Sequence, residues 1–183
     1  MKMSCLRSSS FRSAPLTRLT TLSIVMPALV GLLLGQPASA RMEGGKYLTA
    51  KGCGDGLTLS PGSSDGDGCQ LWRLEPVGGG WVRLQLKHNR KFVDANHCSD
   101  DLLLHPGSTY ADGACQHWRL LPHADGWSRL QLRYNQKFLD ATRCSDDLAL
   151  NPGSTWAGGA CQLWRLIPVA DGWSRIKIKI SDE

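Results

Sequence analysis

The strongest constraint on the fold of this chain of 183 residues is an internal repeat. The motif Gln-x-Trp occurs three times at intervals of 46 residues, at positions 70–72, 116–118 and 162–164. The surrounding sequence repeats as well and divides the chain into three copies, at residues 46–90, 91–136 and 137–183. A period of this length indicates one small structural unit that is used three times.

Each copy is expected to form four short strands. In the second copy we expect them at Lys91–Ala95, Leu102–His105, Gln116–Leu121 and Trp127–Arg133. Apolar residues alternate along the last of these, and the preceding Ala124-Asp125-Gly126 is a hairpin-type turn signal. Four strands alone cannot bury their apolar face, whereas three units that close on a threefold axis can, and closure removes free sheet edges.

The sequence therefore predicts an all-β protein, a β-trefoil of three internal repeats of about 46 residues with twelve strands. A three-bladed propeller is the geometric alternative, but propellers typically need at least about four blades.

Residues 1–40 have the order of segments that is typical of a secretory signal peptide. A basic stretch without acids is followed by 14 apolar residues, Leu22–Gly35, and then by Ala38-Ser39-Ala40, a pattern that signal peptidases accept. The apolar run is short for a membrane span, although an uncleaved anchor is the alternative. We expect a mature trefoil domain at 41–183, without a membrane span, that is secreted, periplasmic or in the cell envelope.

Charge argues against a nucleic-acid partner. The net charge of the whole chain is +5, but four of the 21 basic residues and none of the 16 acidic ones lie in the first 40 residues. The remainder is therefore nearly neutral. It lacks the single-sign field that non-specific binding to nucleic acid requires.

Cysteines also follow the repeat. After residue 40 each copy contains two: Cys53 and Cys69, Cys98 and Cys115, Cys144 and Cys161. An even number in an exported chain predicts disulfides, and the repetition favours one bond inside each copy, worth about 3 kcal/mol for a loop of this length. Metal ligation is the alternative, but neither Cys-x-x-Cys nor a repeated His accompanies the pairs. We expect no metal and no cofactor.

Three Gln-x-Trp motifs in register resemble the ricin B-type lectin domain, a carbohydrate-binding β-trefoil, over residues 41–183. In that family the motif is mainly architectural, since its Trp fills the shared core and its Gln ties the repeat together by hydrogen bonds. The resemblance implies this role for Gln70, Trp72, Gln116, Trp118, Gln162 and Trp164. A second set of tryptophans at the same spacing is also expected to pack: Trp81, Trp127 and Trp173.

The resemblance also implies where a sugar would bind. The sugar-binding Asp of the family ends the first strand, where this chain has Asp94, Asp140 and, in the first copy, Thr49. A carboxylate can accept strong hydrogen bonds from two adjacent hydroxyls, and an aromatic ring can cover the apolar face of the sugar. Tyr110 and Trp156 are the matching aromatic residues in the two copies that keep the Asp.

This co-occurrence predicts sugar sites in repeats two and three and none in repeat one, with His105 and Asn151 as second contacts. One departure is that Cys replaces the Asn that often precedes Gln-x-Trp in the family. The alternative is that Asp94 and Asp140 only bond backbone amides of a local turn. The next turn of these two repeats holds four more candidates for shaping the pocket or for binding Ca²⁺: Asp100, Asp101, Asp146 and Asp147. The dense pattern of oxygen ligands that is typical of a calcium loop is absent.

No catalytic residues are expected, since the chain lacks a nucleophile elbow, an HExxH motif and a Gly-rich phosphate loop. The leading hypothesis is a secreted, non-catalytic, lectin-like protein that binds a glycan or polysaccharide through two sites. The alternatives are a disulfide-stabilised structural protein of the cell envelope and a protein-binding trefoil such as a protease inhibitor.

Overall fold

The computed structural model describes residues 44–63, 68–153 and 156–180, with the backbone alone at Trp156. The predicted signal peptide lies outside these residues. The described residues form twelve strands: β1 Lys46–Ala50, β2 Leu57–Pro61, β3 Trp72–Gly78, β4 Trp81–Leu86, β5 Phe92–Ala95, β6 Leu102–His105, β7 Trp118–Pro122, β8 Ser128–Leu132, β9 Phe138–Ala141, β10 Leu148–Asn151, β11 Trp164–Pro168 and β12 Ser174–Ile178. The all-β, twelve-strand prediction is confirmed.

Short 3₁₀ turns connect the strands. They are η1 Lys51–Cys53, η2 Asn96–Cys98, η3 Tyr110–Gln116, η4 Ala124–Gly126, η5 Thr142–Cys144 and η6 Trp156–Gln162. No helix among the described residues is long and apolar enough to cross a membrane.

Five predicted strand boundaries in the second repeat are wrong by one or two residues, since the strands there are Phe92–Ala95, Leu102–His105, Trp118–Pro122 and Ser128–Leu132. Two of the differences have a clear local cause. The third strand begins at Trp118 and not at Gln116, because Gln116 ends η3 and its side chain bonds the loop that follows β6. The fourth strand begins at Ser128, because the amide of Trp127 donates to the carbonyl of Ala124 and closes η4. In both cases the residue forms hydrogen bonds within a local turn, so it does not pair with a neighbouring strand.

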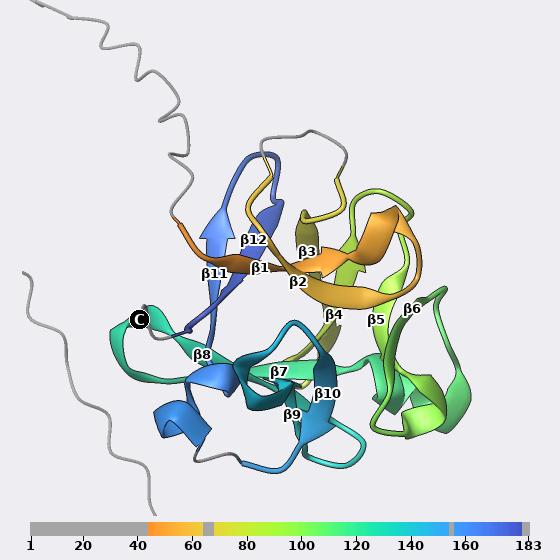
Figure 1. Ribbon diagram of the computed structural model, residues 1–183. Coiled ribbons are helices and arrows are strands. Elements are labelled where there is room, and N and C mark those ends of the chain that lie inside the picture. Colours follow the sequence, from red (N-terminus) through yellow and green to blue (C-terminus); the bar gives the residue numbers. More distant parts are fainter. Residues whose placement is uncertain (1–43, 64–67, 154–155, 181–183) are drawn as a thin grey trace, which may run out of the picture. The chain divides into compact units, whose positions relative to one another are not determined.

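The strands pair in the same way in each repeat, and the pattern closes on itself (Figure 1). Within a repeat the first strand pairs with the second and the third with the fourth. The fourth strand also pairs with the first and third strands of the next repeat, and β12 of the last repeat pairs with β1 and β3 of the first. This closed threefold arrangement is the predicted β-trefoil.

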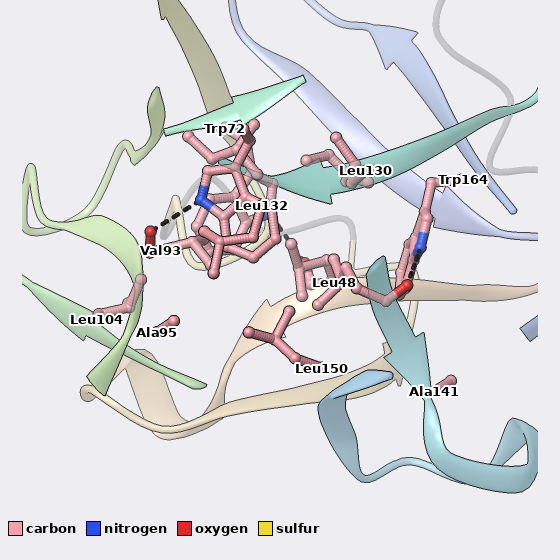
Figure 2. Packing of buried hydrophobic residues seen from close by; sticks show 14 of the residues in the cluster. Leu48, Trp72, Val93, Ala95, Leu104, Leu130, Leu132, Ala141, Leu150 and Trp164 are labelled. Carbon is pink, nitrogen blue, oxygen red and sulfur yellow. Dashed lines mark hydrogen bonds between the residues drawn. The ribbon is translucent and has the colours of Figure 1, made fainter. Parts of the chain in front are cut away.

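The three Gln-x-Trp tryptophans lie in the shared core and are fully buried. Each indole N–H donates to a backbone carbonyl in the first strand of its own repeat. The pairs are Trp72 with Leu48 at 2.9 Å, Trp118 with Val93 at 3.1 Å and Trp164 with Leu139 at 3.0 Å. Figure 2 shows two of these rings among the leucines that the other strands contribute. Each tryptophan therefore connects two strands of its repeat and fills the centre.

The second set of tryptophans lies where one repeat meets the next. Each ring is covered by the arginine that follows the Gln-x-Trp motif of the neighbouring repeat, with the guanidinium carbon about 4 Å from the ring centroid. The pairs are Trp173 with Arg73 at 4.2 Å, Trp81 with Arg119 at 4.1 Å and Trp127 with Arg165 at 4.2 Å. Cation–π contacts of this kind are worth about 0.5–2 kcal/mol each.

Ion pairs repeat across the same boundaries. The lysine that begins each repeat pairs with an aspartate of the preceding one: Lys91 with Asp55, Lys137 with Asp100 and Lys46 with Asp146. All three pairs are partly exposed, and such pairs contribute little individually. Their importance is geometric, because each aspartate carbonyl also accepts an amide from the next repeat.

Each repeat contains one disulfide, Cys53–Cys69, Cys98–Cys115 and Cys144–Cys161, with Cα atoms 4.8–5.1 Å apart. The prediction of one bond within each repeat is confirmed. Each bond ties the turn after the first strand to the residue before Gln-x-Trp. The two segments that flank the end of the first strand are therefore held at a fixed distance.

We expect Trp118→Phe to lower the free energy of unfolding by about 1–3 kcal/mol, because it leaves the buried carbonyl of Val93 without its donor. Trp81→Phe is the matched control. Its ring is half-buried and keeps an aromatic face for Arg119, so the loss should stay below about 1 kcal/mol. Urea unfolding measures both. Equal losses in the two variants would contradict the assigned role of the indole N–H.

Candidate functional site

The second repeat contains a pocket of about 110 Å³ at the end of its first strand. Four elements supply its walls: β5, the turn η2, the end of β6 and the start of η3 with the loop before it. The residues that line it are Asp94, Asn96, His97, His105, Ser108, Tyr110 and Cys115. Three of the predicted site residues therefore come together here from separate parts of the repeat.

The carboxylate of Asp94 is held by the Gln-x-Trp motif. Asp94 is only 5% exposed, and the Gln116 side chain forms a hydrogen bond with it. The same Gln116 amide donates to the carbonyl of Pro106 at 2.9 Å and accepts the amide of Ser108 at 3.1 Å. One side chain thus fixes both the acid and the loop that lines the pocket beside it.

Burial raises the pKa of the Asp94 carboxyl, while the hydrogen bond from Gln116 and the nearby His105 and His97 act in the opposite direction. The raised pKa means that the hydrogen bonds from the protein do not fully compensate the ionised carboxylate for the water molecules it loses on burial. A ligand with hydroxyl donors could replace it.

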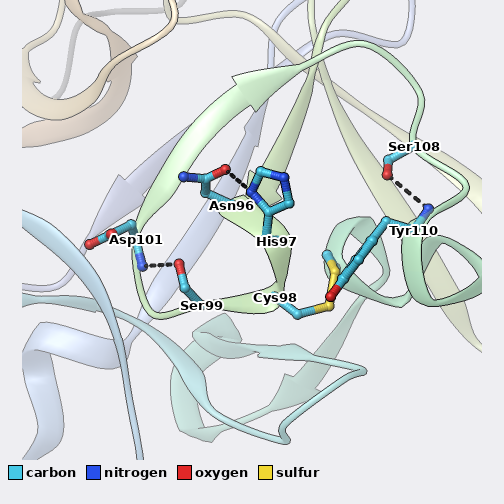
Figure 3. Close-up of a disulfide and its surroundings, with 8 residues drawn as sticks. Asn96, His97, Cys98, Ser99, Asp101, Ser108 and Tyr110 are labelled. Carbon is cyan, nitrogen blue, oxygen red and sulfur yellow. Dashed lines mark hydrogen bonds between the residues drawn. A yellow bond between two sulfur atoms is a disulfide. The ribbon is translucent and has the colours of Figure 1, made fainter.

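Two imidazoles and a phenol ring lie beside this acid. His105 Nδ1 lies 2.8 Å from the carbonyl oxygen of Pro106, which can only accept, so Nδ1 carries the proton. Figure 3 shows His97 between Asn96 and Tyr110, with Nδ1 2.8 Å from Asn96 Oδ1 and its ring edge-on to Tyr110 at 5.8 Å. Tyr110 is 54% exposed and leaves an aromatic face open to a ligand.

The third repeat has a buried acid at the matching position, Asp140. This residue is buried, its Oδ2 has no hydrogen-bond partner among the described residues, and burial raises the pKa of its carboxyl. Hydrogen bonds from Gln162 and Asn151 oppose that shift. The structure therefore brings Asn151 to Asp140, whereas the side chain of Trp156 lies outside what is described.

The first repeat differs at the same place. A pocket of about 190 Å³ is present, but Thr49 replaces the acid, and the described residues that line it carry no charge. The Thr49 hydroxyl donates to the carbonyl of Tyr47 at 2.8 Å and accepts from Gln70 at 2.9 Å. The hydroxyl hydrogen of Thr49 is therefore already engaged in a hydrogen bond to the protein backbone and cannot be donated to a ligand.

Sequence reasoning missed several pocket residues, notably His97 and Ser108. Ser108 could have been found, because all three repeats have serine there. A comparison of the three repeats could not have found His97, because the matching residue is Gly52 in the first repeat and Arg143 in the third. Asp100 and Asp146, considered above as pocket or calcium residues, form ion pairs with Lys137 and Lys46.

One group of three potential metal ligands is close together in the described part of the chain: Cys53, Cys69 and His88. The two sulfurs form a disulfide, and a disulfide sulfur is not the thiolate that binds metals. This group therefore offers a metal ion one imidazole.

Comparison with known families agrees with this architecture. Residues 69–154 match the family described as ricin-type beta-trefoil lectin domain-like. The match includes the pocket of repeat two and Asp140, and it confirms the resemblance seen in the sequence. No curated protein matches the chain.

Solved structures with a similar fold include the designed threefold-symmetric protein ThreeFoil, at 29% identity and a TM-score of 0.56 over 68% of this chain and 91% of that one. SeviL bound to asialo-GM1 saccharide has 19% identity and a TM-score of 0.51, over 72% and 93%. An endo-β-galactosidase from Clostridium perfringens that releases GlcNAcα1-4Gal has 16% identity and a TM-score of 0.57, and this chain covers 30% of it. The last two show likeness of fold alone.

The raised pKa of Asp94 and Asp140 predicts how stability depends on pH. A carboxyl with a higher pKa in the folded state binds more protons there, so its contribution to stability falls as pH rises above about 3.8. We expect Asp94→Asn/Asp140→Asn to unfold at a higher temperature than the parent at pH 7, with a smaller difference at pH 3. Calorimetry at both pH values measures this.

The matched control is Asp101→Asn/Asp147→Asn, which removes two exposed carboxylates from equivalent positions in the same repeats. It should change the melting temperature at pH 7 by less than the site variant does. A site variant that melts below the parent at pH 7 would contradict the assignment of the two acids as desolvated groups.

Proposed function

We propose that this protein is a secreted, non-catalytic carbohydrate-binding protein with one sugar site in repeat two and one in repeat three. The observation that carries the proposal is the pair of buried carboxylates, Asp94 and Asp140, each at the end of a first strand. The Oδ2 atom of Asp140 lacks a partner among the described residues, and a buried acceptor without a donor is unfavourable. A sugar hydroxyl is a suitable donor.

The surroundings of each acid suit a sugar ring. A carboxylate accepts two or more hydrogen bonds, and Gln116 supplies one to Asp94, which leaves acceptor capacity for two adjacent hydroxyls. The exposed ring of Tyr110 offers an apolar surface to the C–H face of the same sugar. The disulfide at Cys115 and the hydrogen bonds of Gln116 keep these groups in place before a ligand binds.

Repeat one is proposed to be inactive. The Thr49 hydroxyl has a single hydrogen, which it donates to Tyr47, and one of its acceptor positions is taken by Gln70. A neutral hydroxyl in this state offers a sugar far less than an ionised carboxylate does.

Two sites on one rigid trefoil suit a repetitive glycan, because the second binding event becomes intramolecular and avidity exceeds the affinity of either site. The family match supports carbohydrate binding in general, and the disulfides are consistent with an oxidising, extracytoplasmic compartment.

A glycan array with the oxidised chain tests the proposal. We expect the parent and the control Asp101→Asn/Asp147→Asn to bind the same glycans. Asp94→Asn/Asp140→Asn should lose at least about tenfold in affinity, since a hydrogen bond to a charged group contributes about 1.5–3 kcal/mol. Each single variant should halve the stoichiometry that calorimetry measures with a monovalent ligand.

Binding that survives in the double variant would place the sugar elsewhere on the trefoil. Failure of the folded parent to bind any glycan would favour the structural or protein-binding alternatives.

A further inference from the structure

A basic residue with a left-handed backbone conformation lies in the turn that follows the strand of each proposed sugar-binding acid. His97 and Arg143 are the middle residues of η2 and η5, with φ values of 50° and 52°. The matching residue of η1 is Gly52, with φ of 57°. Left-handed φ is readily adopted by glycine and is unfavourable for side chains such as these, so the fold itself is better served by glycine here.

The distribution of these residues follows the proposed sites. The repeat without the acid has glycine, whereas the two repeats with Asp94 and Asp140 have His97 and Arg143. Unfavourable backbone conformations that persist often have a function, because the side chain they carry is needed where it stands. Three features therefore occur together at matching positions of repeats two and three and are absent from those positions in repeat one: the acid, the aromatic residue and the basic residue.

Arg143 is not explained by a role as the ion-pair partner of the buried Asp140 carboxylate. Arg143 is exposed and makes no ion pair with any described residue, Asp140 included. His97 lines the pocket of repeat two together with Asp94 and packs edge-on against Tyr110. Both basic side chains are exposed and lie in the turn that follows the strand of the acid.

We propose that the sites select an acidic sugar, one that carries a carboxylate or a sulfate ester, with His97 and Arg143 as the groups that bind its charge. This inference rests on the proposed sugar sites. The ring hydroxyls would bind the buried aspartate, and the anionic substituent would lie at the rim of the pocket. Arg143 can bind a planar carboxylate with two parallel hydrogen bonds, and a protonated His97 can donate from Nε2. A neutral sugar gains neither contact.

The test is an array of matched sugars in mildly acidic buffer, in which imidazole side chains carry a proton. Each neutral hexose is printed beside its uronic acid, the methyl ester of that acid and its 6-sulfate. Within the set of sugars that the protein binds, we expect the uronic acid or the 6-sulfate to bind at least tenfold more tightly than the neutral hexose and the methyl ester. The relative affinity of the uronate and the sulfate identifies which anion the sites prefer.

His97→Gly/Arg143→Gly restores the residue that repeat one uses at this φ, so folding should be unimpaired. The variant should bind the acidic and neutral members of each set equally. Arg143→Lys in the His97→Gly background should recover part of the preference. Arg90→Gly is the matched control, because Arg90 is exposed, has φ of 63° and lies near Trp173 and not among the pocket residues.

Equal binding of neutral and acidic sugars by the parent would overturn this inference and leave the proposed function intact. A preference that persists in His97→Gly/Arg143→Gly would also overturn it. If the parent binds no member of the array, the proposed function itself fails.

Discussion

The rest of the structure depends on one contact that occurs three times, the hydrogen bond from a buried indole N–H to the carbonyl of a first strand. Trp72, Trp118 and Trp164 are large enough to meet in one core, and each needs a polar partner there. That requirement fixes the third strand against the first in every repeat. Because no repeat can bury its apolar face alone, the three must close together.

The same motif connects the core to the surface. Trp118 is buried at the centre, while Gln116, two residues earlier, reaches the Asp94 carboxylate and the loop that bears Ser108. The disulfide at Cys115 begins at the residue before. Core packing, loop position and acid orientation are therefore set within four consecutive residues. A pocket built in this way is rigid, and a rigid site loses little conformational entropy on binding.

The pocket itself departs from what stability favours. Asp94 and Asp140 are desolvated acids with a raised pKa, and His97 and Arg143 adopt a backbone conformation that suits glycine. Repeat one keeps the same fold with Thr49 and Gly52 and avoids both penalties. A comparison of repeat one with the other two therefore shows which residues the fold does not require. Departures from local rules that the fold does not need are expected at functional sites.

By itself, the sequence determined the fold class, the threefold repeat, the disulfide pairing and the two copies that hold an acid, because repetition makes these visible as identities at a fixed spacing. Tertiary structure alone decided that His97 lines a pocket with Asp94 and that Asp100 pairs with Lys137 of the next repeat. It also decided that Trp81 packs on Arg119. These contacts join residues that differ between copies or lie in different repeats. The number of residues between two positions does not tell how far apart they lie across a closed sheet.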